Sequence, residues 1–201
     1  SLYCWGNGVN GELGNGSAEY SAVPVAVVGL NEVSEVSAGG FSTCAIHGTA
    51  RTLSCWGLIN DSLQPQPVFT EAVPVRAAAL GLNHACLINA FGGADEVACW
   101  GSNDYGQLGT GTTTTESRPT TVRRADGSPL AGAAAVAVGN RFSCAQLRSG
   151  EVWCWGTDTA ANARTVPQRV QRVLPGGTLT DFTAAGRITL NPLRHIDPIG
   201  T

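Results

Sequence analysis

Seven cysteines are the side chains of this sequence with the clearest chemical potential. Cysteine thiolates can ligate zinc, and paired thiols can form disulfides. Zinc is disfavoured, because the sequence has no C-x-x-C motif and its three histidines, His47, His84 and His195, are dispersed. Six cysteines fall instead into pairs 11, 13 and 10 residues apart: Cys44 and Cys55, Cys86 and Cys99, Cys144 and Cys154. We therefore predict three disulfides, with buried free thiols as the alternative.

A glycine pattern near the N-terminus could be mistaken for a nucleotide site. Gly6, Gly8 and Gly11 match the dinucleotide-binding pattern G-x-G-x-x-G. The residues that follow, Glu-Leu-Gly-Asn-Gly at 12–16, cannot begin the helix whose N-terminus holds a pyrophosphate. The pattern therefore indicates a turn, and no cofactor is predicted.

The acidic residues offer no catalytic or metal site either. Asn103 and Asp104 lack the alternating acidic residues and the closing glutamate of a calcium loop. Asp95 and Glu96 are the only two adjacent acidic residues in the sequence, and because they follow the Gly-Gly turn they are expected to form a solvated hairpin edge. We predict no catalytic residue and no metal ligand, so the chain is not expected to be an enzyme.

A repeat must position these residues. The tripeptide Cys-Trp-Gly occurs four times, at 4–6, 55–57, 99–101 and 154–156. A proline follows the four tryptophans by 19, 18, 19 and 12 residues, at Pro24, Pro74, Pro119 and Pro167, and a valine follows each proline. Three glycines precede a cysteine by five residues, whereas in the last unit Gly186 precedes Asn191. We expect one region over 1–201, with units starting near 1, 52, 96 and 151 and the last unit degenerate.

The segments between these landmarks predict strands. Two units share an almost identical loop, residues 6–14 and 101–109. Between the loops lie short runs of Val, Ile, Ala and Leu broken by Gly, Pro and Asn, and 131–138 favours an inner strand over a helix. A repeat of 44 to 55 residues with several short strands is typical of a propeller blade, which is stable only when stacked on neighbours. The predicted fold is all-β, with about four four-stranded antiparallel blades.

Turn positions support the cysteine pairs. If Cys86 faces Cys99, the turn centres on Gly92 and Gly93, a favoured two-residue hairpin loop. Alternation then makes the cysteines a non-hydrogen-bonded pair, whose Cα atoms lie about 4.5 Å apart, within the range of a disulfide. Cys144 and Cys154 centre on residues 148–150, and Cys44 and Cys55 on 49–50. Each bridge is expected to contribute about 3 kcal/mol in the chain-entropy model.

Cys4 remains without a partner in this scheme. Its partner should lie five residues after a glycine in a preceding half-unit, upstream of Ser1. If the chain instead closes on itself, residues 186–196 would pair with 2–6, and Asn191 would face Cys4. Both alternatives leave Cys4 unpaired within the chain.

Composition excludes several functional classes. Charged residues are 13% of the chain and hydrophobic residues 43%, which argues against disorder. The net charge is −3 and the arginines are scattered, so nucleic acid is not an expected partner. No apolar stretch is long enough to span a membrane, and any signal peptide is expected to have been removed or to lie upstream of Ser1. Three disulfides would place the protein in a secreted, periplasmic or cell-surface setting.

The pattern C-W-G-x-N-x-x-G-x-L-G-x-G, a Pro-containing strand and A-x-G-x-x-x-S-C-A resembles the repeat of the regulator of chromosome condensation propeller family. The match is best over 99–111, Pro119 and 138–145, and it resembles especially the cysteine-bearing, exported bacterial branch. The resemblance implies that Trp-Gly strands and Gly-x-Leu-Gly loops lock adjacent blades. The lock residues it implies are Trp5, Gly6, Trp56, Gly57, Trp100, Gly101, Gln107, Leu108, Gly109, Trp155 and Gly156.

The family usually has seven blades, which would take about 350 residues. We therefore expect part of a larger ring rather than an unusual small ring. Two functions follow. One is a protein-interaction module that presents loops such as 58–69 and 110–117 to an extracytoplasmic partner. The other is a structural component of a surface assembly that other chains complete. Guanine-nucleotide exchange, known in the family, is less expected, because a disulfide-bearing chain would not meet a nuclear GTPase.

Overall fold

The computed structural model describes residues 1–69, 73–90, 94–157, 163–173 and 179–181, and it shows strands and turns but no helix within these ranges. The strands are β1 (Tyr3–Gly6), β2 (Ser21–Ala26), β3 (Val33–Gly39), β4 (Ser42–His47), β5 (Thr52–Gly57), β6 (Ser62–Pro67), β7 (Val75–Leu80), β8 (His84–Asn89), β9 (Glu96–Gly101), β10 (Glu116–Thr121), β11 (Ala133–Val138), β12 (Phe142–Leu147), β13 (Val152–Gly156), β14 (Gln168–Arg169), β15 (Gln171–Val173) and β16 (Leu179–Asp181). The segment predicted as an inner strand, 131–138, contains β11.

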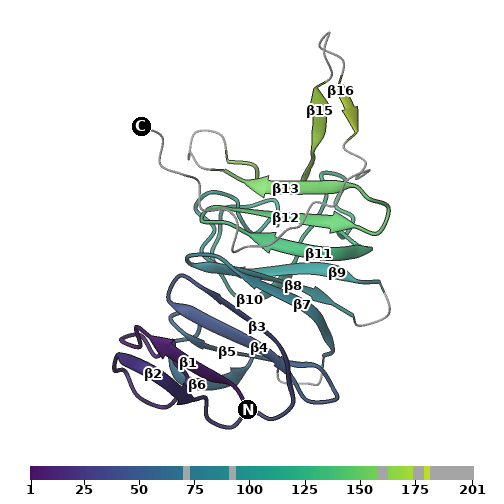
Figure 1. The fold of residues 1–201 in the computed structure, drawn as a ribbon. Helices are drawn as coiled ribbons and strands as arrows, with labels where there is room; N and C mark the ends of the chain where they lie inside the picture. The colour runs from purple at the N-terminus through teal and green to yellow at the C-terminus, as the bar shows by residue number, and fades with distance from the viewer. Residues whose placement is uncertain (70–72, 91–93, 158–162, 174–178, 182–201) are drawn as a thin grey trace.

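Twelve of these strands form three antiparallel sheets in which consecutive strands are neighbours. The sheets are β3–β6, β7–β10 and β11–β14, while β1 pairs with β2 and β15 with β16. In Figure 1 the sheets lie one above another, from β1 and β2 at the bottom to β13 near the top. This architecture confirms the prediction of an all-β fold with four-stranded antiparallel blades.

Each repeat unit straddles two sheets. The Cys-Trp-Gly tripeptides lie at the ends of β1, β5, β9 and β13. Each of the strands β5, β9 and β13 is the third strand of its four-stranded sheet. A unit that begins at Cys-Trp-Gly therefore contains the last two strands of one sheet and the first two of the next.

Hydrophobic side chains between neighbouring sheets make up the core. One cluster joins the second and third four-stranded sheets and includes Ile88, Val97 and Leu147. Another joins the first and second of these sheets and includes Ile46, Leu53 and Leu87. Because each sheet buries its faces against another sheet, the stability of each depends on its neighbours.

The choice of Pro74 as the proline landmark of the second unit is wrong. Pro24 in β2 and Pro119 in β10 each lie three residues after the first residue of the strand that pairs with a Cys-Trp-Gly strand. In the second unit that strand is β6, so the matching residue is Pro65, and Pro74 precedes the inner strand β7. The mismatch arises because four residues connect β5 to β6, whereas fourteen connect β1 to β2 and β9 to β10.

Candidate functional site

The first fourteen-residue connection, residues 7–20, covers a tryptophan of the next sheet. The carbonyl oxygen of Glu12 accepts hydrogen bonds from Trp56 Nε1 at 2.7 Å and from Thr43 Oγ1 at 3.0 Å. Leu13 is buried, with 2% of its surface exposed. Gly14 has a φ of +67°, and a Cβ there would lie 2.6 Å from Trp56 Nε1, so glycine permits the close approach. We call this connection and its counterpart, residues 102–115, lock loops.

The second lock loop repeats the arrangement at the boundary between the sheets β7–β10 and β11–β14. The carbonyl oxygen of Gln107 accepts a hydrogen bond from Ser143 Oγ at 2.9 Å, and Leu108 is fully buried. A Cβ at Gly109 would lie 2.8 Å from Trp155 Nε1. Here the indole nitrogen of Trp155 has no hydrogen-bond partner among the described residues, and Ser143 is the residue that anchors the Gln107 carbonyl.

Asn103 holds the second lock loop together. Its Nδ2 donates to the carbonyl oxygens of Thr112 and Thr114 at 3.0 and 2.9 Å, and its Oδ1 accepts from the backbone of Leu108. The side chain is fully buried. Part of the predicted binding loop 110–117 is therefore fixed to the lock residues rather than free.

No lock loop covers Trp100 at the middle sheet boundary. The connection from β5 to β6, Leu58–Asp61, is ten residues shorter than a lock loop. The loop is held by a hydrogen bond from its backbone nitrogen of Ile59 to Ser42 Oγ at 2.8 Å and by one from the side chain of Asn60, whose Nδ2 donates to the Cys55 carbonyl at 2.7 Å. The ten missing residues leave a groove that Trp100 lines, although the indole itself is buried, with 4% of its surface exposed.

The groove lies between the short loop and the outer strand β10. One part has a volume of about 640 Å³ and an adjoining part about 390 Å³. Trp100 lines both parts, together with Ile59, Asn60, Ser117 and Arg118. Leu58 and Leu82 stand at the rim with 50% and 41% of their surfaces exposed. Both loops predicted to bind a partner, 58–69 and 110–117, contribute residues to this groove.

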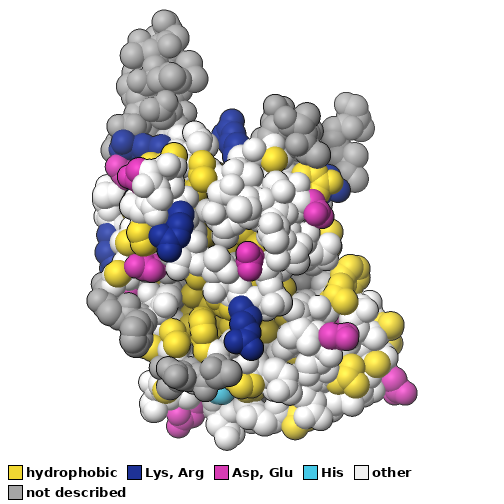
Figure 2. Space-filling model, turned by 180° about the vertical axis from the view of Figure 1, so that it is seen from behind, with side chains coloured by type: hydrophobic (Ala, Val, Ile, Leu, Met, Phe, Trp, Pro, Cys, Tyr) yellow, Lys and Arg dark blue, Asp and Glu magenta, His cyan; other side chains and the backbone are white. Residues whose placement is uncertain are grey.

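The charge around the groove is mixed. Glu116 and Arg118 line it, and no ion pair involves Arg118 among the described residues. Seen from behind, charged side chains are scattered over the molecule, some of them in pairs of opposite charge, while hydrophobic side chains gather across the middle of this face (Figure 2). A neutral or mildly charged polypeptide therefore matches this surface better than a polyanion.

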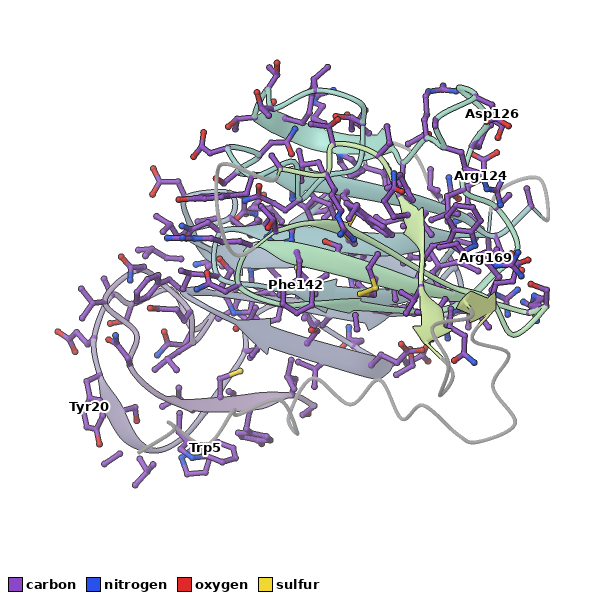
Figure 3. All side chains as sticks on the ribbon, turned by 90° about the horizontal axis from the view of Figure 1, so that it is seen from above. Trp5, Tyr20, Arg124, Asp126, Phe142 and Arg169 are labelled. Atoms are coloured by element: carbon purple, nitrogen blue, oxygen red, sulfur yellow. A yellow bond between two sulfur atoms is a disulfide. The ribbon has the colours of Figure 1, made fainter. Side chains whose placement is uncertain are left out.

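Three of the four repeat tryptophans are buried, including Trp100, which no lock loop covers but whose cluster Ile59, Val68 and Phe69 pack against. Trp56, Trp100 and Trp155 expose 0%, 4% and 1% of their surfaces, whereas Trp5 exposes 64%. Figure 3 places Trp5 near Tyr20, on the opposite side of the molecule from Arg124 and Arg169. No described residue pairs with the second edge of β1.

Six cysteines lie as their spacing predicts. Within each sheet two cysteines are opposed in neighbouring strands at disulfide distance, with Cα atoms 4.0 to 4.1 Å apart: Cys44 with Cys55, Cys86 with Cys99, and Cys144 with Cys154. Gly150 closes the third hairpin with a φ of +89°, and the predicted turn at Gly92 and Gly93 lies outside the described residues. Cys4 has no sulfur partner in the described chain, and burial raises its pKa. Its predicted alternative partner position, Asn191, also lies outside the described residues.

The expectation that Asp95 is solvated is wrong. Only 6% of its surface is exposed, and its carboxylate contacts Arg76 at 2.7 Å and Arg148 at 2.6 Å. Hydrogen bonds from Arg148 and Arg76 lower the pKa of Asp95. Arg148 belongs to the turn after β12, so this carboxylate joins two sheets, an arrangement that the local sequence Asp-Glu after Gly-Gly does not reveal.

His84 is a structural residue at the same sheet boundary. It is 1% exposed, and its Nε2 lies 3.0 Å from Ser143 Oγ. Burial lowers its pKa from 6.5 to about 4, and a hydrogen bond with the backbone of Phe142 opposes this shift. No group of three or more His, Cys, Asp or Glu side chains suited to a metal ion occurs within the described ranges.

The shortened loop could have been found in the sequence. Pro65 follows Trp56 by nine residues, whereas Pro24 and Pro119 follow their tryptophans by 19. Choosing Pro65 instead of Pro74 reveals the shortened loop. What the spacing does not reveal is that Ile59, Val68 and Phe69 pack against the cluster containing Trp100, because those contacts depend on how the loop folds back.

Comparison with known proteins agrees with these features. Two models described as "Regulator of chromosome condensation (RCC1) repeat" match, one over residues 1–46 and 95–146 and the other over 133–160. The ultraviolet-B receptor UVR8 of Arabidopsis thaliana is 27% identical over 202 residues, which cover 90% of this chain and 44% of that protein.

No helix in the described ranges has the length and apolar character needed to cross a membrane.

Two solved structures share the fold. Human WBSCR16 superposes with a TM-score of 0.68 at 21% identity, covering 85% of this chain and 48% of that one. Prp20p from Saccharomyces cerevisiae superposes with a TM-score of 0.63 at 21% identity, covering 85% and 46%. The chain thus spans about half the length of these relatives.

Proposed function

This chain belongs to the regulator of chromosome condensation (RCC1) repeat family, and we propose that it is a non-enzymatic, extracytoplasmic protein-interaction module. The observation that carries the proposal is the groove above Trp100, where a lock loop is missing and apolar side chains are left accessible. Its walls come from the rigid sheets β3–β6 and β7–β10, so it is preformed. A preformed groove with an apolar floor and a mixed polar rim is suited to binding a polypeptide.

The extracytoplasmic setting rests on the cysteines. All six paired cysteines lie on adjacent strands with their sulfur atoms at disulfide distance, and such pairs persist in oxidising compartments. We place the protein in the secreted, periplasmic or cell-surface class, in keeping with its resemblance to the cysteine-bearing, exported bacterial branch of the family. We treat residues 1–201 as one propeller region, part of a ring of seven blades.

A crosslinking experiment tests the interaction proposal. A photoreactive amino acid replaces Ser117, which is exposed and lines the groove, and, as a matched control, Asp126, which is exposed but does not line it. Incubated with the extracytoplasmic proteins of the cells that produce the chain, the Ser117 probe should yield a discrete adduct that the Asp126 probe does not. Adducts of equal yield from both positions, or none from either, would contradict the proposal.

A structural role is the alternative, and the β1 end of the molecule favours it. Trp5 is 64% exposed, and the second edge of β1 is unpaired in the described chain, so another chain could add strands there. Size-exclusion chromatography with light scattering separates the two functions. The interaction module should be monomeric in the absence of its partner, whereas a structural component should form an obligate complex or a polymer.

Guanine-nucleotide exchange is a third, less favoured function. The solved structure of Prp20p is described together with its binding to Gsp1p and histones. We do not extend these partners to this chain, because its paired cysteines suit neither a nuclear nor a cytosolic setting, where Gsp1p and histones would be met.

A further inference from the structure

Strand register identifies the groove residues that correspond to a lock-loop site. Gly6 pairs with Ser21, Gly57 with Ser62, and Gly101 with Glu116, so the outer strands β2, β6 and β10 begin in the same register. Residues Ser62–Gln64 of β6 therefore correspond to Glu116–Arg118 of β10. These three β10 residues line the groove.

The two filled sites show how a lock loop binds an outer strand. At the first boundary the backbone nitrogen of Gly16 donates to the Leu63 carbonyl at 3.0 Å. At the last boundary the nitrogen of Gly111 donates to the Thr165 carbonyl at 2.8 Å. The corresponding acceptor in the groove is the carbonyl of Ser117, and no turn or loop donor reaches it in the described chain.

The part of the groove lined by Trp100 corresponds to the place that a lock loop occupies at the other two sheet boundaries. Trp56 Nε1 donates to the lock-loop carbonyl of Glu12, whereas no hydrogen bond joins Trp100 Nε1 to any described residue. The residue paired with the tryptophan is Thr43 or Ser143 at the filled sites and Ala85 at the groove. Trp100 Nε1 is therefore a side-chain donor that the groove can offer to a carbonyl.

We infer that the groove is a vacant lock-loop site that binds a Leu-Gly loop of a partner protein, an inference that rests on the proposed function. The partner's leucine packs on Ile59 and Trp100, as Leu108 packs in the cluster that contains Trp155. Its glycine permits close approach to the indole, as Gly14 and Gly109 do. The carbonyl before the leucine accepts from Trp100 Nε1, and a backbone N–H beyond the glycine donates to Ser117.

Arg118 adds a preference for charge. At the first boundary Gly16 approaches the side-chain amide of Gln64, with a Cβ position 2.9 Å from Nε2. The residue in register with Gln64 is Arg118, which is exposed and has no ion pair among the described residues. A carboxylate two residues after the partner's glycine would lie near this guanidinium, so an acidic Leu-Gly loop is favoured over a basic one.

A cyclic peptide copied from the chain's own lock loop tests the inference. Residues Gly6–Ser21 are cyclised head to tail, because Gly6 and Ser21 pair in the structure and cyclisation reproduces their closeness. The peptide is titrated to about 1 mM into the full chain while the indole N–H signals are followed by NMR, with Trp100 assigned from a Trp100→Phe variant. The Trp100 signal should shift and saturate. A control peptide with Leu13→Ser should bind at least about tenfold more weakly, because it loses the buried leucine.

A loop graft supplies the second arm. Replacing Leu58–Asp61 by residues 7–20 fills the groove from within the chain, so the grafted protein should not bind the peptide. Absence of a Trp100 shift at the highest concentration, an equal shift with the control peptide, or unchanged binding to the graft would overturn the inference. If the peptide fails while the Ser117 probe still gives a specific adduct, the partner binds by other chemistry and the proposed function survives. If both fail, the proposed function falls as well.

Discussion

At the scale of single residues, the buried charged and titratable groups lie at sheet boundaries rather than in a reaction centre. Asp95 and His84 both connect β7–β10 to β11–β14, the first through Arg148 and the second through Ser143. The sequence gives no indication that Arg148 contacts Asp95 or that Ser143 contacts His84, because these partners lie more than fifty residues away. Local pattern predicts which strand a residue occupies, whereas its long-range partners depend on how the sheets stack.

The depressed pKa of His84 predicts loss of stability in mild acid. The folded protein holds this imidazole neutral down to about pH 4, whereas the unfolded chain binds a proton near pH 6.5. The unfolded state therefore binds more protons between these values, and the contribution of His84, about 3 kcal/mol, is lost as the pH falls from 7 to 4. Urea unfolding at both pH values should show this difference. The variant His84→Gln should reduce the pH dependence by a similar amount, and an unchanged dependence would contradict the assignment.

Asp95 should matter for stability although it lies far from the groove. Asp95→Asn removes the charge shared by Arg76 and Arg148, and because both arginines are about half exposed we expect a cost of about 1–2 kcal/mol. Since the pKa of Asp95 is lowered, its contribution is present above the ordinary carboxyl pKa and is lost as the pH falls below it. Thermal unfolding at neutral pH measures the cost. Asp104→Asn, an exposed control, should change the stability little.

At the scale of elements, the hairpins were largely predictable and the connections were not. Turn positions and strand alternation predicted the opposition of three cysteine pairs, because a two-residue periodicity fixes which residues face each other. The short connection between β5 and β6 was missed, because Pro74 and Val75 happen to imitate the landmark of another strand. A loop can lose ten residues without disturbing the strands on either side, so periodicity does not reveal the loss.

Thiol labelling tests the hairpin pairing. Under native, non-reducing conditions a maleimide should modify at most one thiol per chain, at Cys4, which is partly exposed. After denaturation and reduction, seven thiols should react. Mass spectrometry measures both numbers, and a Cys4→Ser variant should give none in the native state. Labelling of all seven in the native, unreduced protein would contradict the three pairs.

The lock loops should be intolerant of a methyl group at the glycine that contacts tryptophan. Gly109→Ala adds the cost of a left-handed backbone, about 1–2 kcal/mol, to a clash with Trp155. Gly127→Ala is a matched control, because Gly127 has a φ of +82° with nothing within 4 Å of the added Cβ. The difference between the two unfolding free energies isolates the clash. Equal costs would mean that the loop accommodates the added methyl group without further loss of stability and does not hold the two sheets together.

At the scale of the whole molecule, the stacked sheets and the family followed from the repeat. The groove did not, because it is defined by what is missing at one of three similar boundaries. The repeat landmarks are dominated by residues that build blades. Specific function in such a fold therefore depends on departures from the repeat, and the shortened loop is the clearest departure within the described chain.

The most direct test of this account measures partner crosslinking from Ser117 in the wild-type chain and in the chain whose groove is filled by the loop graft at 58–61. Both proteins keep β10, and light scattering and thermal unfolding establish that the graft is folded and monomeric. The account predicts a specific adduct with the wild-type chain and at least about a tenfold lower yield with the graft, because the buried leucine site is already occupied. An equal yield from both proteins would show that the partner binds elsewhere and would contradict the central claim.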